Sequence, residues 1–285
     1  MLTWHGMTLL SLFFLGAQRF LYKVAAEKGY STTLTTMVFV SSVSLMSAVL
    51  LVFQRSAIVQ PLFFIALSIV NGASFGAATI ASIEALKRLP SNAALPLIRL
   101  NTALVVLFSI VYFGERLSVL QIAGIILAIG VIFLLMGFNG TESTVQGNLK
   151  GWLFAFIAFI AGAVAAISSK LASQIVEPLA FMALSYGVGT VMIVLLKNYL
   201  PQPSAHRSVR SSIALGFAMG VLNFVGFYAF MKALAQGPLS LVAPITGMHF
   251  VVAIVISAFV YREKLTAIRA LGIALTVVSV VLMRL

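Results

Sequence analysis

The chain has no cysteine and few charged side chains among its 285 residues. Without cysteine it can form neither a disulfide framework nor a thiolate metal site. Charged residues make up 8% of the sequence and hydrophobic residues 61%, whereas a soluble domain carries about 25% charged residues. So few charges cannot cover a water-exposed surface, and we therefore expect most of the chain to contact lipid.

Acidic residues are especially scarce. Aspartate is absent, and all six acidic residues are glutamates. Metal-dependent membrane enzymes depend on clustered carboxylates and histidines, and this chain has scattered glutamates, three histidines and no H-E-x-x-H sequence. It also lacks the G-x-x-x-x-G-K-[ST] loop that binds ATP phosphates. We therefore predict no catalytic residues, no metal, no cofactor and no direct drive by ATP.

The net charge of +12 would favour nucleic-acid binding in a soluble chain. In a membrane chain the same excess is typical of short loops beside lipid head groups. We therefore predict membrane lipids and a small-molecule substrate as partners, with no nucleic acid, and we expect a monomer.

Ten segments are long and apolar enough to span a bilayer, which takes about 20 residues each. They are residues 3–22, 32–53, 61–86, 93–113, 118–138, 151–173, 179–199, 211–234, 240–261 and 266–284. The start of the chain has no basic region and no small-residue cleavage site, so we expect the first segment to stay as a membrane helix. A polar connector at residues 139–150 divides the chain into a first half, residues 1–138, and a second half, residues 151–285.

The two halves carry the same element. Residues 111–130 read VYFGERLSVLQIAGIILAIG, and residues 259–278, which lie 148 positions later, read FVYREKLTAIRALGIALTVV. The most informative matches at this offset are Pro90 with Pro238, Pro96 with Pro244, Glu115 with Glu263 and Gly124 with Gly272. Since five helices are an odd number, the second half enters the membrane from the opposite side. Inverted repeats of this kind build secondary transporters whose site lies near the midplane, and one copy of the element would close each face.

The repeated element resembles a motif of the drug/metabolite transporter superfamily, in its ten-helix EamA-type branch. That family has a short G-E-R/K-L turn followed by a glycine-containing helix. Gly114–Leu117 and Gly124 match it in the first half. Arg262–Leu265 and Gly272 match it in the second half, with Arg262 in place of the glycine.

The first helix resembles the same family, which often has W-G, a polar residue and then a lysine. Gly16, Gln18 and Lys23 match this pattern, and Leu15 stands in place of the tryptophan. The sixth segment ends similarly at Lys170. The resemblance implies an all-α integral membrane protein of ten helices, arranged as two inverted five-helix repeats around a central cavity, that transports small metabolites.

The family resemblance and the charge distribution favour opposite membrane orientations. The resemblance implies an N-terminus in the cytoplasm. On that assignment most lysines and arginines outside the helices face outward, whereas the positive-inside rule predicts that they face the cytoplasm. The sequence leaves both orientations open.

Arg99 is the clearest candidate for substrate binding. A charge at membrane depth costs about 2.5–3.5 kcal/mol on insertion scales, so it should face a cavity or a partner. Its planar fork could bind a carboxylate or a phosphate, or it could pair with Glu84 and join two helices. Pro96 lies three residues earlier, and we predict that Pro96 and its repeat partner Pro244 act as hinges.

Other polar residues in the apolar segments are further candidates. Gln18 and Arg19 lie in the first segment, and we predict that both face the substrate. Glu84 could bind substrate or carry the coupled proton, or it could compensate the charge of Arg99, Lys87 or Arg88. Asn101 lies roughly 200° from Arg99 around the helix, so it should contact a neighbouring helix instead.

Segments eight and nine add three more candidates for substrate binding. Asn223 and Tyr228 could line a cavity for a partly apolar substrate. His249 could relay protons or simply pack. Gly216 and Gly220 predict close packing of segment eight on a neighbouring helix.

These residues predict a secondary, alternating-access transporter of amino acids or related carboxylate-bearing metabolites, acting as an exporter in the cell (inner) membrane. The alternative is efflux of cationic drugs or quaternary ammonium compounds. The first helix has Gln18 and Arg19 where small multidrug-resistance relatives use a glutamate, which counts against the alternative.

Overall fold

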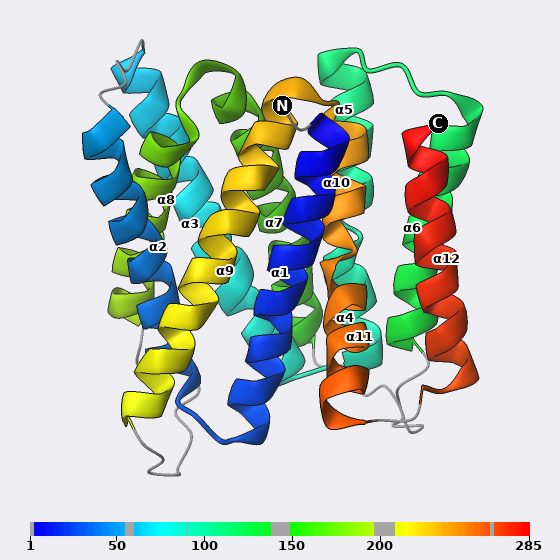
Figure 1. Ribbon diagram of the computed structural model, residues 1–285, viewed down its shortest axis with the longest axis horizontal. Helices are drawn as coiled ribbons and strands as arrows, with labels where there is room; N and C mark the ends of the chain where they lie inside the picture. Colours follow the sequence, from blue (N-terminus) through cyan, green and yellow to red (C-terminus); the bar gives the residue numbers. More distant parts are fainter. Residues whose placement is uncertain (1–2, 55–59, 90, 138–148, 197–208, 263–264) are drawn as a thin grey trace.

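The computed structural model describes residues 3–54, 60–89, 91–137, 149–196, 209–262 and 265–285. All regular elements in these ranges are α-helices (Figure 1), which confirms the predicted all-α membrane fold. They are α1 (Trp4–Glu27), α2 (Thr32–Gln54), α3 (Pro61–Leu86), α4 (Ser91–Arg99), α5 (Asn101–Phe113), α6 (Val119–Gly137), α7 (Leu149–Ile175), α8 (Pro178–Leu196), α9 (Val209–Gln236), α10 (Leu239–Gly247), α11 (His249–Tyr261) and α12 (Ala267–Arg284).

The ten predicted segments correspond to these twelve helices because two segments are interrupted. In the described ranges, nine helical stretches are long and apolar enough to cross a membrane, and Val119–Leu135 of α6 is a shorter apolar helix. The structure differs from the prediction at the start of the second half, where α7 begins at Leu149, inside the predicted connector. The rest of that connector, residues 139–148, lies outside the described residues, as does Glu263.

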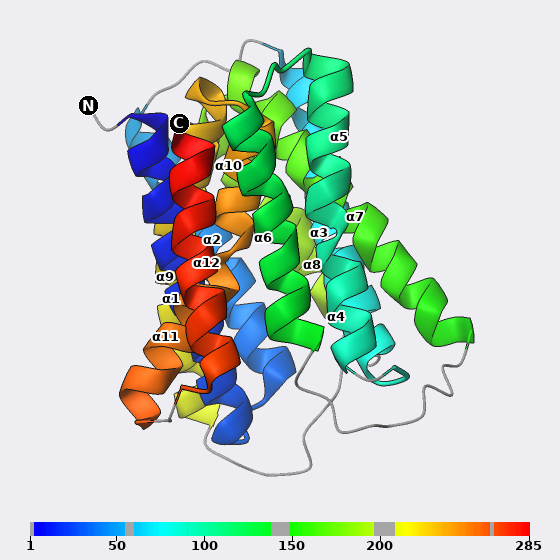
Figure 2. The same ribbon diagram turned by 90° about the vertical axis from the view of Figure 1, so that its right-hand side faces the viewer.

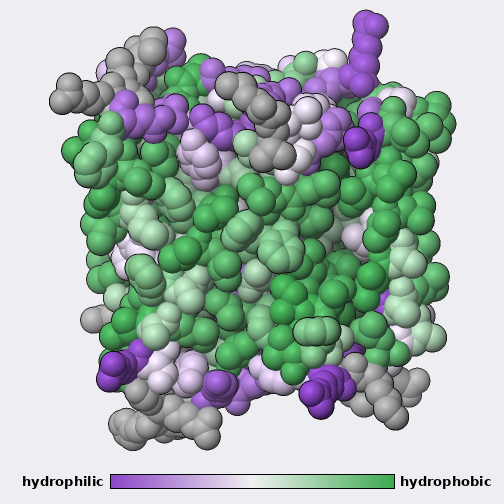
Figure 3. Space-filling view, viewed as in Figure 1, coloured by the Kyte–Doolittle hydropathy of each residue, from purple (hydrophilic) through white to green (hydrophobic). Residues whose placement is uncertain are grey.

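The outer surface is suited to lipid. Figure 3 shows a broad hydrophobic band bounded at both edges by hydrophilic side chains. Large apolar side chains such as Phe53, Leu62 and Phe259 are at least 80% exposed. In water such a surface would be unfavourable, whereas in a bilayer it faces hydrocarbon chains. The chain is therefore a multi-pass integral membrane protein.

The two repeats are inverted relative to each other. Both chain termini lie at one edge of the bundle (Figure 1), and we call this edge the termini face. The first repeat starts at this face with α1, and the second starts at the opposite face with α7. The helix contacts show the same symmetry between the repeats. The contact of α1 with α9 is equivalent to the contact of α7 with α3, and the equivalent helices α2 and α8, and α6 and α12, pack on each other.

The two interrupted helices break at equivalent positions of the repeats. Leu100 separates α4 from α5, and Met248 separates α10 from α11. Each break comes four residues after a proline, at Pro96 and at Pro244. Because a nine-residue helix is about 13 Å long, each break lies near the middle of a bilayer core about 30 Å thick. Interrupted backbone at that depth is tolerated only inside the protein.

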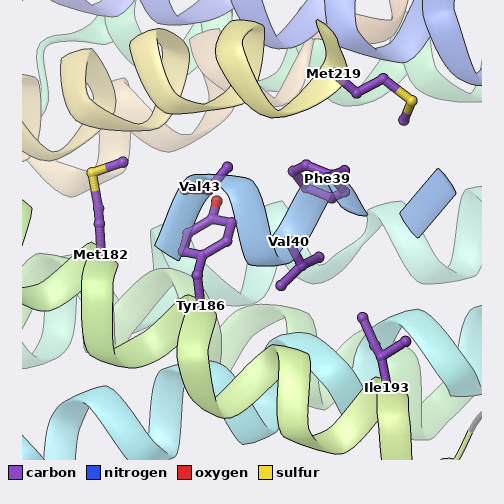
Figure 4. Close-up of a cluster of buried hydrophobic side chains, with 7 residues drawn as sticks. All are labelled: Phe39, Val40, Val43, Met182, Tyr186, Ile193 and Met219. Atoms are coloured by element: carbon purple, nitrogen blue, oxygen red, sulfur yellow. The ribbon is translucent and has the colours of Figure 1, made fainter. Parts of the chain in front are cut away.

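Between the two halves lies a core to which α2, α8 and α9 contribute. Figure 4 shows its buried side chains, which are Phe39, Val40, Val43, Met182, Tyr186, Ile193 and Met219. A Cβ atom added at Gly216 would lie 2.7 Å from the backbone oxygen of Thr35 in α2. The close packing predicted for α9 is therefore confirmed.

The repeated glycines Gly124 and Gly272 both lie in the contact between α6 and α12. Ser279 Oγ donates a hydrogen bond of 2.7 Å to the Gly124 carbonyl. A Cβ at Gly124 would lie 3.0 Å from the Ser279 backbone oxygen and 2.8 Å from Met283 Cγ. A Cβ at Gly272 would instead meet the tip of Leu135, 2.5 Å away.

We predict that Gly124→Ala destabilises the protein more than Gly272→Ala. The backbone facing Gly124 cannot move without shifting α12, whereas the Leu135 side chain can change rotamer. Overpacking of this kind costs about 1–3 kcal/mol. Thermal unfolding of the purified variants in detergent measures the difference, and a higher melting temperature for Gly124→Ala than for Gly272→Ala would contradict the packing.

Candidate substrate-binding site

The two helix breaks bring Arg99 and His249 together with Arg19. Arg99 is the last residue of α4, and His249 is the first residue of α11. Arg19 Nε donates a hydrogen bond of 3.2 Å to His249 Nε2, and Arg99 interacts electrostatically with both residues. Arg19, Arg99 and His249 are called the cationic cluster below. Both repeats contribute to it.

His249 has a defined orientation in this cluster. Its Nδ1 lies 2.9 Å from the carbonyl oxygen of Thr246 in α10. Since Nε2 accepts from Arg19, Nδ1 must carry the proton and donate it to this carbonyl. The ring is buried, whereas Arg19 is exposed.

A second group of polar side chains lies next to the cluster. Asn223 Nδ2 donates to Gln18 Oε1 at 3.1 Å, and the Tyr186 hydroxyl donates to Asn223 Oδ1 at 2.6 Å. All three are buried. Gln18 and Arg19 are consecutive on α1 and point about 100° apart, so one helix turn serves both groups.

Aromatic rings surround this polar chain. The centroid of the Tyr186 ring lies 6.3 Å from Phe39, 6.0 Å from Phe75 and 5.5 Å from Phe227. Tyr22 lies between the two groups, because its ring is 6.4 Å from Phe39 and 5.6 Å from the Arg19 guanidinium carbon. Figure 4 shows Tyr186 reaching from α8 toward α2.

Tyr186 and Tyr22 were not among the site residues predicted from the sequence. Tyr186 follows Ser185 in the middle of an apolar segment, and this pair of polar residues was the local indication of a polar contact inside the bundle. Nothing in the local sequence shows that the Tyr186 hydroxyl meets Asn223, because the two belong to different helices. Tyr22 lies three residues after Arg19, which puts both on one side of α1.

Glu84 lies away from the cluster, at the end of α3. Its carboxylate accepts hydrogen bonds from Lys87 Nζ and Arg88 Nη1. In the described part of the chain, no carboxylate pairs with Arg19 or Arg99. The structure therefore does not contain the Glu84–Arg99 pair considered from the sequence, and Glu84 compensates its basic neighbours instead. Asn101 lies against Gly162 of α7, on a neighbouring helix as predicted.

Tyr228 also lies apart from the cluster. It lines a pocket of about 380 Å³ whose other lining residues are Leu50, Phe53, Gln54, Leu179 and Phe224. Lys232 Nζ lies 5.5 Å from the centroid of the Tyr228 ring. The structure thus brings Gln18, Arg19, Arg99, Asn223 and His249 into one region and leaves Glu84 and Tyr228 outside it.

A further pair of charged side chains holds the turn between α9 and α10. Glu115 follows α5 and accepts hydrogen bonds from Leu239 N at 2.8 Å, Ser240 N at 2.9 Å and Ser240 Oγ at 2.5 Å. Lys170 Nζ donates to the carbonyls of Leu234 at 2.6 Å and Gly237 at 2.8 Å. These contacts complement the dipoles of both helices, with an acid at the start of α10 and a base at the end of α9.

An inverted bundle with a polar site at two helix breaks is the architecture of a membrane transporter. The model of the EamA-like transporter family matches residues 2–137 and, a second time, residues 149–285. The chain belongs to this family, as the resemblance of its motifs implied, and it is a membrane transporter of small molecules. Members of the family are transporters and not enzymes.

Comparison with solved structures supports the same fold. One structure, described as "Crystal structure of protein", has a TM-score of 0.81 and 16% sequence identity, with 97% of this chain and 94% of that chain covered. At this identity the likeness concerns the fold alone. No curated protein sequence matches the chain.

We predict that Glu115 makes the stability depend on pH. Burial alone would raise the pKa of its carboxyl, but the hydrogen bonds from Ser240 and Leu239 hold it below the ordinary glutamate value. A lowered folded-state pKa means that the carboxylate stabilises the fold above the ordinary pKa, and that this contribution is lost as the pH falls through the folded-state pKa.

The measurement is the melting temperature of the wild type and of Glu115→Gln between about pH 7 and about pH 3, a range that includes the ordinary glutamate pKa. The wild type should exceed the variant most at the upper end, and the difference should shrink on acidification. A difference that stays constant with pH would show that the charge of Glu115 does not stabilise the fold.

Proposed function

We propose that the protein is a secondary transporter that exports amino acids or related carboxylate-bearing metabolites across the cell (inner) membrane. The observation that carries this proposal is the cationic cluster. Arg99 and His249 lie at the two helix breaks, Arg19 of α1 binds His249, Arg99 interacts electrostatically with both, and no described carboxylate pairs with either arginine.

Electrostatics favours an anion at this place. The two guanidinium groups interact electrostatically. Like charges at membrane depth repel, and each is costly away from water. A substrate carboxylate between them would reduce both the repulsion and the cost of removing each guanidinium group from water. The planar arginine fork binds carboxylates with two parallel hydrogen bonds.

The surroundings of the cluster support a substrate with a second, less polar part. Gln18, Asn223 and Tyr186 provide amide and hydroxyl groups, and the partly buried rings of Tyr22 and Phe75 provide apolar surface. Sites of this kind, mostly apolar with a few convergent polar groups, are typical for small molecules. An amino acid with an apolar side chain has this composition.

Transport by this chain would be driven by gradients, since the sequence has no ATP-binding loop. The inverted repeats provide the usual basis of alternating access, in which the two halves expose one central site to each face in turn. The pairing of Glu84 with Lys87 and Arg88 favours charge compensation over proton coupling at that residue.

We predict that carboxylates raise the melting temperature of the purified protein and that Arg99→Ala removes this effect. A ligand that binds only the folded state must stabilise it. The loss of hydrogen bonds to a charged group is worth about 1.5–3 kcal/mol, or roughly a 10- to 150-fold weaker affinity. The panel should contain amino acids, other organic anions and quaternary ammonium cations.

Arg210→Ala is the matched control, because Arg210 is exposed at the start of α9 and its removal changes the net charge equally. It should keep the response to carboxylates. If the panel stabilises wild type and Arg99→Ala equally, Arg99 is not a substrate ligand. Stabilisation by cations alone would favour the drug-efflux alternative, since aromatic rings also hold cations. Loss of preloaded substrate from vesicles containing the protein would then test the export direction.

A further inference from the structure

The repeats are equivalent in sequence, but the structure packs their interrupted helices differently at the two faces. At the termini face, α10 packs along α5. Leu239, Leu241 and Val242 of α10 are at most 2% exposed there. The equivalent pair at the opposite face is α4 and α11. Figure 2 shows these two helices at opposite sides of the lower edge, and they make no comparable contact in the described residues.

At the termini face, where α10 packs along α5, Glu115 and Lys170 hold α10 and the turn before it in place. Glu115 comes from the turn after α5, so its three hydrogen bonds tie the first repeat to the start of α10. Lys170 comes from α7 and binds the end of α9. Together they hold the α9–α10 turn from two other helices. Gly237 in this turn also lies against Trp4 of α1, where a Cβ would come within 2.7 Å of the ring.

A lysine of the first repeat, Lys23, stacks on the corresponding ring at the opposite face. Lys170 lies over the ring of Phe113 at 5.9 Å, and Lys23 lies over the ring of Tyr261 at 5.0 Å. Phe113 and Tyr261 are equivalent in the repeat. Lys170 also donates to backbone carbonyls of α9, and the contacts of Lys23 include a hydrogen bond to Ser257 Oγ and an ion pair with Glu27 of its own helix at 3.6 Å.

We propose that Glu115 and Lys170 form a latch that holds the termini face closed, and that this face opens in the transport cycle when the latch releases α10. This proposal rests on the transporter function of the family and does not depend on the substrate. A failure to identify a carboxylate substrate would therefore leave it standing, and it can be tested without any substrate.

The test uses the absence of native cysteine, which gives thiol labelling no background. Ala243→Cys in α10 and Leu95→Cys in α4 are the reporters, because these two positions are equivalent in the repeat and both are partly buried. Each reporter is combined with Glu115→Gln or Lys170→Met and treated with a membrane-impermeant maleimide from either face. A tag at the C-terminus identifies the termini face.

Glu177→Gln is the matched control, combined with the same two reporters. Glu177 lies at the termini face like the latch, but it binds Gln54 and Lys232 instead of the α9–α10 turn. Its substitution removes the same charge as Glu115→Gln and leaves the latch intact. The control should therefore label like the parent.

Releasing the latch should raise labelling of the α10 reporter from the termini face and lower labelling of the α4 reporter from the opposite face. We expect the labelling of each reporter to change about tenfold. The loss of a charge-assisted hydrogen bond shifts a two-state equilibrium by about this factor. Unchanged labelling in both latch variants, or increased labelling of both reporters, would overturn the proposal, since a merely structural role would loosen both faces.

Glu115→Asp provides a second test if Glu115→Gln does not fold. The shorter acid keeps its charge but reaches less far toward Leu239 and Ser240, so it should shift both reporters in the same directions by a smaller factor. If the folded Asp variant labels like the parent at both reporters while Lys170→Met does as well, the latch does not control the face.

Discussion

A polar group inside hydrocarbon needs a partner within the protein, and this constraint shapes the whole molecule. It requires helices throughout the membrane region, because a helix satisfies its own backbone. It permits interruptions only inside the protein, and at the two breaks Met248 is buried and Leu100 partly buried. The free helix ends and the charges near them then become the chemically active parts. Site and latch are both built from such ends.

The α9–α10 turn and the helix breaks differ in whether the protein supplies partners of opposite charge for the polar groups there. At the α9–α10 turn the protein itself supplies both partners, a carboxylate for the start of one helix and an ammonium group for the end of the other. Near the midplane breaks, Arg19 donates a hydrogen bond to His249, and Arg99 interacts electrostatically with both residues. We propose that the first arrangement closes a face and that the second binds an anionic ligand. Transport by alternating access needs both.

The two repeats are similar in sequence, but their interrupted helices pack differently in the structure. Pro96 and Pro244, Phe113 and Tyr261, and Gly124 and Gly272 occupy equivalent positions in their repeats. In the structure, however, α10 packs on α5 while α4 and α11 lie apart. Two nearly equivalent halves can exchange these roles at small energetic cost, which is the physical basis for exposing one site to two faces in turn.

The sequence by itself determined the membrane environment, the helical spans, the inverted repeat and the family, because hydrophobic length and repeated motifs are properties of the linear chain. It also singled out Arg19 and Arg99, since a charge within an apolar run is visible without a structure. Only the tertiary structure decided their partners. That Arg19 binds His249, that Tyr186 meets Asn223, and that Glu115 caps α10 depend on how helices far apart in sequence pack. Such contacts are set by packing geometry across the bundle, and no local pattern encodes them.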